Sequence, residues 1–389
     1  MASLFGIDEK KLLRRRRAAE TRFRLCAIAA LVLAGAFLVF FLFDIGRKGY
    51  PAFQQGELLV TVNYTTEAHD NPYAAMDPDT VQIVSRSFTR LIPSMMAENS
   101  RLIGTTQEIW VLASADTDQY MKGRPNRLKP RHQALVDTMR QEGKARLAFN
   151  WGFFESGDSK LPELAGIRAA AIGSLYVLLI TLAISFPVGV MCAVYLEEFA
   201  PDNRLTQVIE VNINNLAAIP SILYGLLGLA IFINFMGVAR SSALVGGLTL
   251  SLMTLPAIII STRAAIRSIP PSIREAALAL GATPLQVVWH HVLPLSLPGI
   301  LTGTIIGLAR AMGETAPLLI VGMMAYIPEA PENFSSAATV LPAQIFTWAS
   351  DSQRAFSERT AAGILVLLVL LLGMNATAIW LRNKYERKW

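Results

Sequence analysis

Two charged side chains interrupt an otherwise apolar stretch of the sequence, residues 297–323. Arg310 and Glu314 are four residues apart, so on one helix they would share a face and could form an ion pair. Ionisable groups inside a membrane span are rare, and they usually face an interior pathway. The pair therefore favours a passage through a membrane. The alternative is a buried pair that only locks helices together.

Three glycines in the same stretch form a second pattern. Gly299, Gly303 and Gly307 recur every four residues. Small residues at this spacing give a helix a seam that a second helix can approach closely. We expect these glycines to form a helix packing contact beside the charged pair.

A third pattern, in residues 263–294, predicts a helical hairpin between two apolar segments. Prolines can open a first short helix, because they need no amide donor in its first turn. Gly281 can close that helix in the left-handed conformation. Thr283 can then cap a second helix that has Pro284 at its first position. The first helix would expose small side chains able to enter a groove of another protein: Ala276, Ala277 and Ala279. An ordinary loop between spans is the alternative.

No sequence pattern of an enzyme, a metal site or a cofactor site is visible. A Gly-x-x-x-x-Gly-Lys-Ser/Thr loop is missing, so the chain is not expected to hydrolyse ATP alone. The four histidines form no His-Glu-x-x-His helix, and there is no Gly-x-Ser-x-Gly elbow. We therefore expect no catalytic residue, no metal ligand and no cofactor.

Composition indicates a membrane protein. Of the 389 residues, 53% are hydrophobic and only 16% are charged, whereas soluble domains carry about 25% charged residues. Two cysteines exclude a disulfide framework and a four-ligand zinc site. The net charge of +6 does not indicate nucleic-acid binding, because 8 of the 35 basic residues lie in the first 24 positions, directly before an apolar segment.

Six apolar segments predict six membrane spans. They are residues 25–43, 169–196, 216–236, 243–262, 297–323 and 361–381. An even number of spans places both termini on one side, and the basic ends 1–24 and 382–388 indicate the cytoplasm. For the first segment, a cleaved signal peptide is the alternative, but its apolar run continues past the possible cleavage site, so we favour an uncleaved anchor.

Residues 44–168, between the first two spans, are long enough to fold separately. Residues 58–64 and 109–113 read as strands, and 79–95 reads as one amphipathic helix. Long loops cross the membrane largely regardless of charge, so we place this segment outside the cytoplasm as a small α/β insertion domain. We expect an accessory role, either receiving a soluble binding protein or bracing a partner subunit.

The hairpin resembles the EAA loop of ABC importer permeases. The residues that carry the resemblance are Glu275, Ala276, Ala277, Gly281, Leu293 and Pro294. The resemblance implies that the short helix docks into a cleft of a cytoplasmic ATPase and transmits its motion. One departure is His291, two positions before the Leu-Pro pair, where an apolar residue is usual.

Residues 307–317 resemble the Arg-Ala-x-Gly-Glu-Thr stretch of PstA-type phosphate importer permeases, and the likeness extends over 169–389. It implies a MetI-like core in an all-α polytopic protein, with the small α/β insertion between helices 1 and 2. Arg310 would then attract the phosphate oxyanion, Glu314 would restrain Arg310 or bias the gate, and Thr315 would lie beside them in the passage. A guanidinium is compatible with this role, since its planar fork of donors suits phosphate oxygens.

The resemblance also implies partners and a location. The partners would be a second permease subunit of the PstC type, a cytoplasmic ATPase dimer of the PstB type and an extracytoplasmic phosphate-binding protein of the PstS type, and the location would be the bacterial inner membrane. Alternatives are an importer permease for another oxyanion, such as sulfate or molybdate, and a membrane sensor with an external domain. A self-sufficient secondary transporter is disfavoured by the docking loop.

Overall fold

The computed structural model describes residues 9–324 and 326–385, and the chain divides after Lys48 into two units. The first unit contains nearly all of the helix α1, Glu9–Gly49, which is 41 residues long and contains the predicted span 25–43. At about 1.5 Å per residue such a helix reaches roughly 60 Å, about twice the hydrocarbon thickness of a bilayer. It therefore extends well beyond the membrane span itself.

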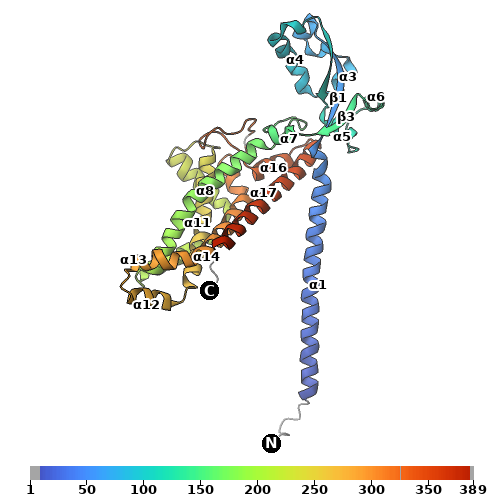
Figure 1. Ribbon diagram of the computed structural model, residues 1–389. Helices are drawn as coiled ribbons and strands as arrows, with labels where there is room; N and C mark the ends of the chain where they lie inside the picture. The colour runs from blue at the N-terminus through green and yellow to red at the C-terminus, as the bar shows by residue number, and fades with distance from the viewer. Residues whose placement is uncertain (1–8, 325, 386–389) are drawn as a thin grey trace. The chain divides into compact units, whose positions relative to one another are not determined.

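The second unit holds the other apolar helices (Figure 1). Counting α1, five helices of the described chain are long and apolar enough to cross a membrane, or six if one bent pair counts as a single span. This confirms the predicted polytopic helical fold. The candidate membrane-spanning helices of the second unit are α8 (Arg168–Val194), α11 (Ala243–Arg267), α14 (Leu293–Gly313), α17 (Ala355–Tyr385), and the bent pair α9 (Arg204–Ala217) and α10 (Ser221–Gly228).

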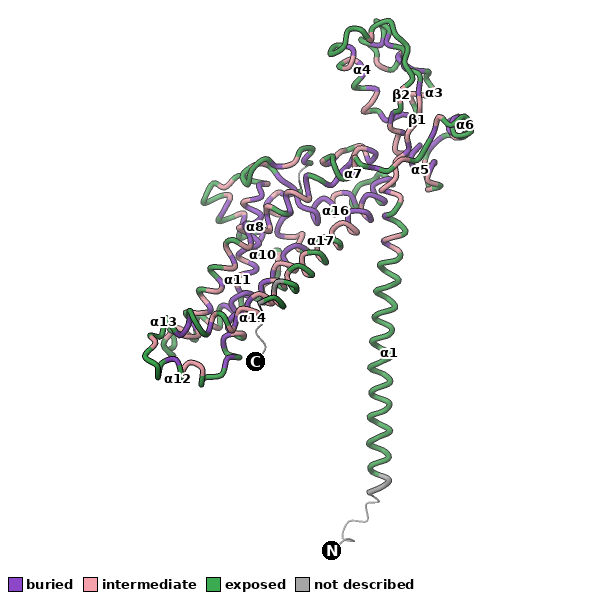
Figure 2. The backbone as a smooth tube through the Cα atoms, in the orientation of Figure 1, coloured by how far each residue is buried: buried purple, intermediate pink, exposed green. Residues whose placement is uncertain are grey.

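The helix α11 is the centre of this bundle. It packs along α8 on one side and α14 on the other, and most of its apolar window is buried. A glycine permits the first contact, because a Cβ at Gly247 would lie 2.5 Å from the Cβ of Ile180 on α8. Exposed residues, in contrast, follow the C-terminal half of α17 (Figure 2). That half of α17 is available to lipid or to another subunit.

The predicted third span, 216–236, is wrong at its start. The helix breaks between Ala217 and Ser221, the two pieces meet at 104°, and α10 continues as a π-helical segment, η5, Leu229–Phe235. Proline disfavours the helical conformation of the residue before it, and Pro220 occupies this break. The apolar segment after the bend therefore begins at Ser221.

The predicted fifth span, 297–323, is also interrupted. α14 ends at Gly313, Glu314 is extended, and a short helix α15 restarts at Ala316–Ile320. Pro317 supplies the reason, since a proline inside a continuous helix clashes with the carbonyl four residues earlier, here that of Gly313. Glu314 therefore does not share a helix face with Arg310, contrary to the prediction.

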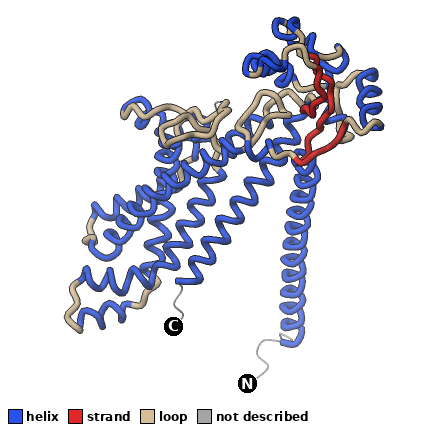
Figure 3. The backbone as a smooth tube through the Cα atoms, turned by 45° about the horizontal axis from the view of Figure 1, so that its top comes forward, coloured by secondary structure: helices blue, strands red, loops and turns tan. Residues whose placement is uncertain are grey.

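The insertion contains a three-stranded antiparallel sheet with strand order β2-β1-β3 (Figure 3). Leu58, Val60 and Val62 alternate along β1 and fill the core beneath the sheet. The predicted strands correspond to β1 and β2, whereas β3 was not predicted. The strands and longer helices are β1 (Gln54–Asn63), β2 (Thr106–Leu112), β3 (Ala145–Phe149), α3 (Pro78–Ile83), α4 (Arg86–Glu98), α5 (Ala115–Met121) and α6 (Pro130–Gln141).

The single helix predicted over 79–95 is wrong, because α3 and α4 are separate helices. Val84 leaves the helix to form a β-bridge with Ala113. Ser85 caps α4 by accepting from the amide of Ser87, and its own hydroxyl donates to Glu163 Oε1 at 2.8 Å. The break is thus set by two contacts with distant parts of the chain.

A buried charge network joins the insertion to the first turn of α17. Lys122 donates to Asp118 Oδ2 and to Glu358 Oε1, each at 2.7 Å, and its side chain is only 2% exposed. Gln119 donates to the other oxygen of Glu358 at 2.9 Å. Asp118 also accepts from the amide of Gly56 at 2.7 Å. We call these residues, with Arg359, the insertion joint.

Arg359 completes the insertion joint from α17. Its Nε donates to the carbonyl of Pro162 and its Nη1 to that of Ala52, both at 3.0 Å. Each carbonyl lies near one end of the insertion. Lys122 thus binds two carboxylates and Arg359 binds two backbone carbonyls, and these side chains are nearly closed to water.

Candidate docking and passage sites

The predicted hairpin forms at one end of the second unit, away from the sheet (Figure 1). Its first helix is α12, Pro271–Ala279. Gly281 follows with φ of +86°, the left-handed conformation that favours glycine. Thr283 then caps α13, Pro284–Val287, by accepting from the Gln286 amide, and the Gln286 side-chain oxygen accepts from the Thr283 amide, which completes a capping box. α13 continues through a π-helical segment, η6 (Val288–Val292), into α14.

One predicted docking residue faces the wrong way. Glu275 and Ala276 are exposed, but Ala277 is only 6% exposed and packs against the hairpin's own core. One face of α12 packs against the rest of the hairpin. Ala277 lies on that face and belongs to the same core cluster as the buried Val287 and Val292. The prediction that Ala277 is exposed is wrong.

Four large apolar side chains that were not predicted form the outer surface of the hairpin. Leu280 is 90% exposed, and the full set is Leu278, Leu280, Leu285 and Trp289. Several exposed large apolar side chains on one short segment are typical of a protein contact surface. The sequence could have indicated these residues, because the hairpin segment 263–294 is predicted to lie outside the membrane and yet contains many apolar residues. Leu293, half-buried, and Pro294, exposed, lie just beyond it at the start of α14.

Ion pairs brace the hairpin against the end of α8. Arg274 on α12 binds Glu198 through two guanidinium nitrogens, at 2.7 and 3.1 Å, and also donates to the carbonyls of Ile266 and Ile269. The paired fork geometry fixes direction as well as distance. The sequence analysis did not predict this contact. The only sequence feature that indicated it was the pair of adjacent carboxylates, Glu197 and Glu198, after the second predicted span.

Two further arginines extend the bracing along α11. Arg263 donates to Glu197 and Glu210, and Arg267 donates to Glu197 at 2.5 Å. Glu210 lies on α9, so the ends of α8, α9 and α11 share one set of charges. A displacement of α12 therefore acts on several helices at once.

The glycine seam of α14 faces α11. A Cβ at Gly303 would lie 1.9 Å from Ser261 Oγ, and one at Gly299 would lie 2.5 Å from the Cβ of Ala265. Gly307 has more room, with its nearest neighbour, Ile258, at 3.8 Å. The first two glycines permit a close helix contact that larger residues would block.

The charged pair lies at the end of α14. Arg310 Nε and Glu314 Oε1 are 3.6 Å apart, and their side chains are 57% and 21% exposed. The pair forms although Glu314 is outside the helix, and at this distance it is an ion pair without a close hydrogen bond. Thr315, half-buried, follows at the start of α15. The Arg310 guanidinium therefore keeps donors free for another oxygen ligand.

The break between α14 and α15, beside Arg310 and Glu314, packs closely against α10. A Cβ at Gly225 would lie 2.7 Å from the Cα of Pro317, so the two backbones touch. Tyr224 is buried and its hydroxyl donates to the carbonyl of Leu216 at 2.7 Å. The two interrupted helices, α9–α10 and α14–α15, thus meet next to Arg310.

Residues 185–388 match the family described as the binding-protein-dependent transport system inner membrane component. The chain belongs to this family. Residues 10–82 and 73–131 also match a domain of unknown function, DUF3333. As a family member the chain is a permease subunit of an ABC importer and not an enzyme. It spans the membrane several times and works with an ATPase and a substrate-binding protein.

Three relatives illustrate the likeness. The probable ABC transporter permease protein YqgI of Bacillus subtilis is 32% identical over 63% of this chain and 87% of its own length. The phosphate transport system permease protein PstA 1 of Mycobacterium tuberculosis is 30% identical, covering 59% of this chain and 75% of its own. The phosphate transport system permease protein PstA of Xylella fastidiosa is 31% identical over 57% of this chain and 77% of its own length.

Proposed function

We propose that this chain is the PstA-type permease subunit of an ATP-driven inorganic phosphate importer. The observation that carries the proposal is Arg310: an exposed guanidinium at a helix break, paired only at 3.6 Å with Glu314. Such a group can take up an oxyanion without first breaking a strong internal bond. Relatives named phosphate transport permeases support the choice of anion.

The assembly that we propose has four kinds of chain. A PstC-type permease would cover the exposed side of Arg310 and complete the passage with Glu314 and Thr315. A PstB-type ATPase dimer would dock on the hairpin at Glu275, Ala276, the Gly281 turn, Leu293 and Pro294. A PstS-type protein would deliver phosphate from the other side.

We also propose that both termini and the hairpin lie in the cytoplasm and that the insertion lies outside. Hairpin and sheet are at opposite ends of the helices of the second unit, which supports opposite sides of the membrane (Figure 1). The basic ends of the chain favour the cytoplasm. Labelling of single cysteines with a membrane-impermeant maleimide in intact cells tests this. Labelling at Arg131→Cys, but not at Arg387→Cys, is expected, and the reverse would overturn the orientation.

The decisive experiment measures ATP-dependent phosphate uptake by the complex reconstituted in proteoliposomes. Arg310→Ala should abolish uptake while the subunits still co-purify, and Arg310→Lys should impair it, because lysine keeps the charge but loses the planar fork. Arg354→Ala, at another exposed arginine, is the matched control and should transport normally.

Two outcomes would contradict the proposal. Stronger competition by sulfate or molybdate than by unlabelled phosphate would change the substrate to another oxyanion. Normal uptake by the swapped pair, Arg310→Glu with Glu314→Arg, would show that the residues only attract each other and do not contact the anion.

A further inference from the structure

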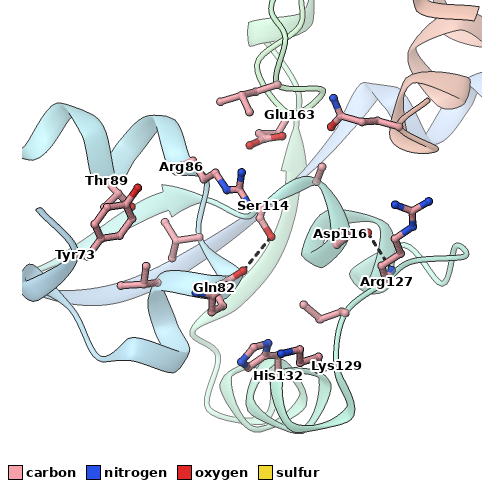
Figure 4. Close-up of a pocket in the computed structure, with 16 residues that line it drawn as sticks. Tyr73, Gln82, Arg86, Thr89, Ser114, Asp116, Arg127, Lys129, His132 and Glu163 are labelled. Atoms are coloured by element: carbon pink, nitrogen blue, oxygen red, sulfur yellow. Dashed lines mark hydrogen bonds between the residues drawn. The ribbon is translucent and has the colours of Figure 1, made fainter. Parts of the chain in front are cut away.

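A cavity of about 450 Å³ lies in the insertion, where it meets segments next to the helical core (Figure 4). Its walls come from α3 and α4, from the start of α5 and from the segment before α6. Leu161 and Gln353, from the segments before α8 and α17, close the remaining side. Cavities of about 300–1,000 Å³ are the usual size of small-molecule sites.

Three basic side chains line this cavity without a partner. Arg86, at the start of α4, Arg127 and Lys129 come from separate places in the chain and are labelled around the cavity in Figure 4. Across residues 9–324 and 326–385, none of these three side chains makes a hydrogen bond or an ion pair. Basic groups gathered in a concave site without counter-charges attract anions.

The acidic groups in the walls offset this charge only in part. Asp116 Oδ1 already accepts the backbone amide of Arg127 at 3.0 Å. Burial raises the pKa of Glu163, which favours its neutral form, although Ser85 donates to one of its oxygens. His132 is buried and faces Asp79, with Nε2 and Oδ1 3.5 Å apart. The three cations therefore outnumber the two carboxyl groups in the walls, Asp116 and Glu163.

Two buried oxygens in the same walls are unsatisfied. Thr89 Oγ1 and Glu163 Oε2 belong to residues that are at least nine-tenths buried, and neither has a hydrogen-bond partner in the described chain. Leaving such a group unpaired costs about 1–3 kcal/mol, so native proteins rarely do so without a ligand or an ordered water. This observation is independent of the charges and also indicates an occupant.

We propose that this cavity binds an oxygen-rich organic anion carrying phosphoryl or carboxylate groups. Arg86, Arg127 and Lys129 would hold its charged oxygens, while Thr89 would supply a polar contact, as would Glu163 when it carries a proton. At about 450 Å³ the cavity has room for many times the roughly 30 Å³ that one water molecule takes up, which favours an organic molecule over a lone inorganic ion. The site is separate from Arg310, and it would operate whichever solute the permease carries.

Thermal unfolding of the full chain, purified with its partner subunits in lipid nanodiscs, tests the proposal. The probes are glycerol 3-phosphate for the phosphoryl class, citrate for the carboxylate class, inorganic phosphate, and glycerol as the neutral control. A ligand that binds only the folded state raises the unfolding temperature in a concentration-dependent way. We expect this from at least one organic anion and not from glycerol, and the more effective anion identifies the class.

Substitutions locate the effect. Arg86→Ala and Arg127→Ala should each weaken the stabilising anion about tenfold or more, because a hydrogen bond to a charged group contributes about 1.5–3 kcal/mol. Both residues are exposed and unpartnered, so their loss should not unfold the protein. Arg101→Ala is the matched control, an exposed arginine that does not line the cavity, and should bind like the wild type.

Three results would overturn the proposal. The first is no stabilisation by either organic anion. The second is stabilisation that survives both cavity substitutions unchanged. The third is inorganic phosphate binding as tightly as both organic anions, which would refute the argument from size.

Discussion

Replacing Lys122 by methionine tests the insertion joint most directly. Methionine keeps the length and apolar stem of lysine but removes the charge that holds Asp118 and Glu358 together. The two carboxylates would then remain buried without their shared cation. Removing one partner of a buried ion pair costs about 3–5 kcal/mol, since the other charge is left uncompensated.

Hydrogen exchange measured by mass spectrometry reports the loss of stability at the insertion joint segment by segment. If the joint opens as a unit, amides of α5 and of the first turn of α17 should exchange roughly a hundredfold to several thousandfold faster in Lys122→Met, because each 1.36 kcal/mol is a factor of about ten. Amides in α11, remote from the joint, should be unaffected.

Two further variants complete the test. Glu358→Gln added to Lys122→Met removes one orphaned charge and should restore part of the protection. Lys144→Met removes a lysine whose partner, Glu142, is at the surface, and should change nothing measurable. Wild-type exchange in α5 of Lys122→Met would refute the reasoning that this network holds the insertion in place.

Three other predictions concern the helical core. Gly281→Val should cost the hairpin turn roughly 1 kcal/mol or more, because a Cβ is strained at φ of +86°, and it should reduce co-purification of the ATPase. Arg274→Ala should leave Glu198 without its bidentate partner and lower uptake per ATP hydrolysed, as the brace between α12 and α8 is lost; normal coupling would show that the brace is dispensable. Gly303→Ala should lower the unfolding temperature, since its Cβ would lie 1.9 Å from Ser261 Oγ, and Ser261→Gly in the same chain should restore it; a stable single variant would mean that the helices can move apart.

Local chemistry made the hairpin predictable from sequence. Gly281, Thr283 and Pro284 each act on their immediate neighbours, so the left-handed turn, the cap and the helix start could all be read in order. The burial of Ala277 could not be predicted in this way, because it depends on Val287 and Val292 packing against α12 in the folded hairpin.

Other features depended on residues far apart in the chain. The break at Ser85 follows from its bond to Glu163, 78 positions later, and the insertion joint pairs Lys122 with Glu358, 236 positions later. Neither contact is part of a periodic sequence pattern from which it could be predicted. The interruptions at Pro220 and Pro317 are different, since each has a local proline signal. That signal alone is not sufficient, because Pro187, Pro256 and Pro298 lie inside continuous helices.

The insertion joint bears on how such a chain could have gained or could lose its extra domain. Without the insertion, Glu358 would lose Lys122 and Gln119, and Arg359 would lose both of its carbonyl acceptors. Two unpaired charges would then stand at the start of a membrane helix. The domain is therefore tied to α17 by side-chain contacts as well as by the chain: a shortened chain with neutral residues at 358 and 359 should be more stable than one that keeps Glu358 and Arg359.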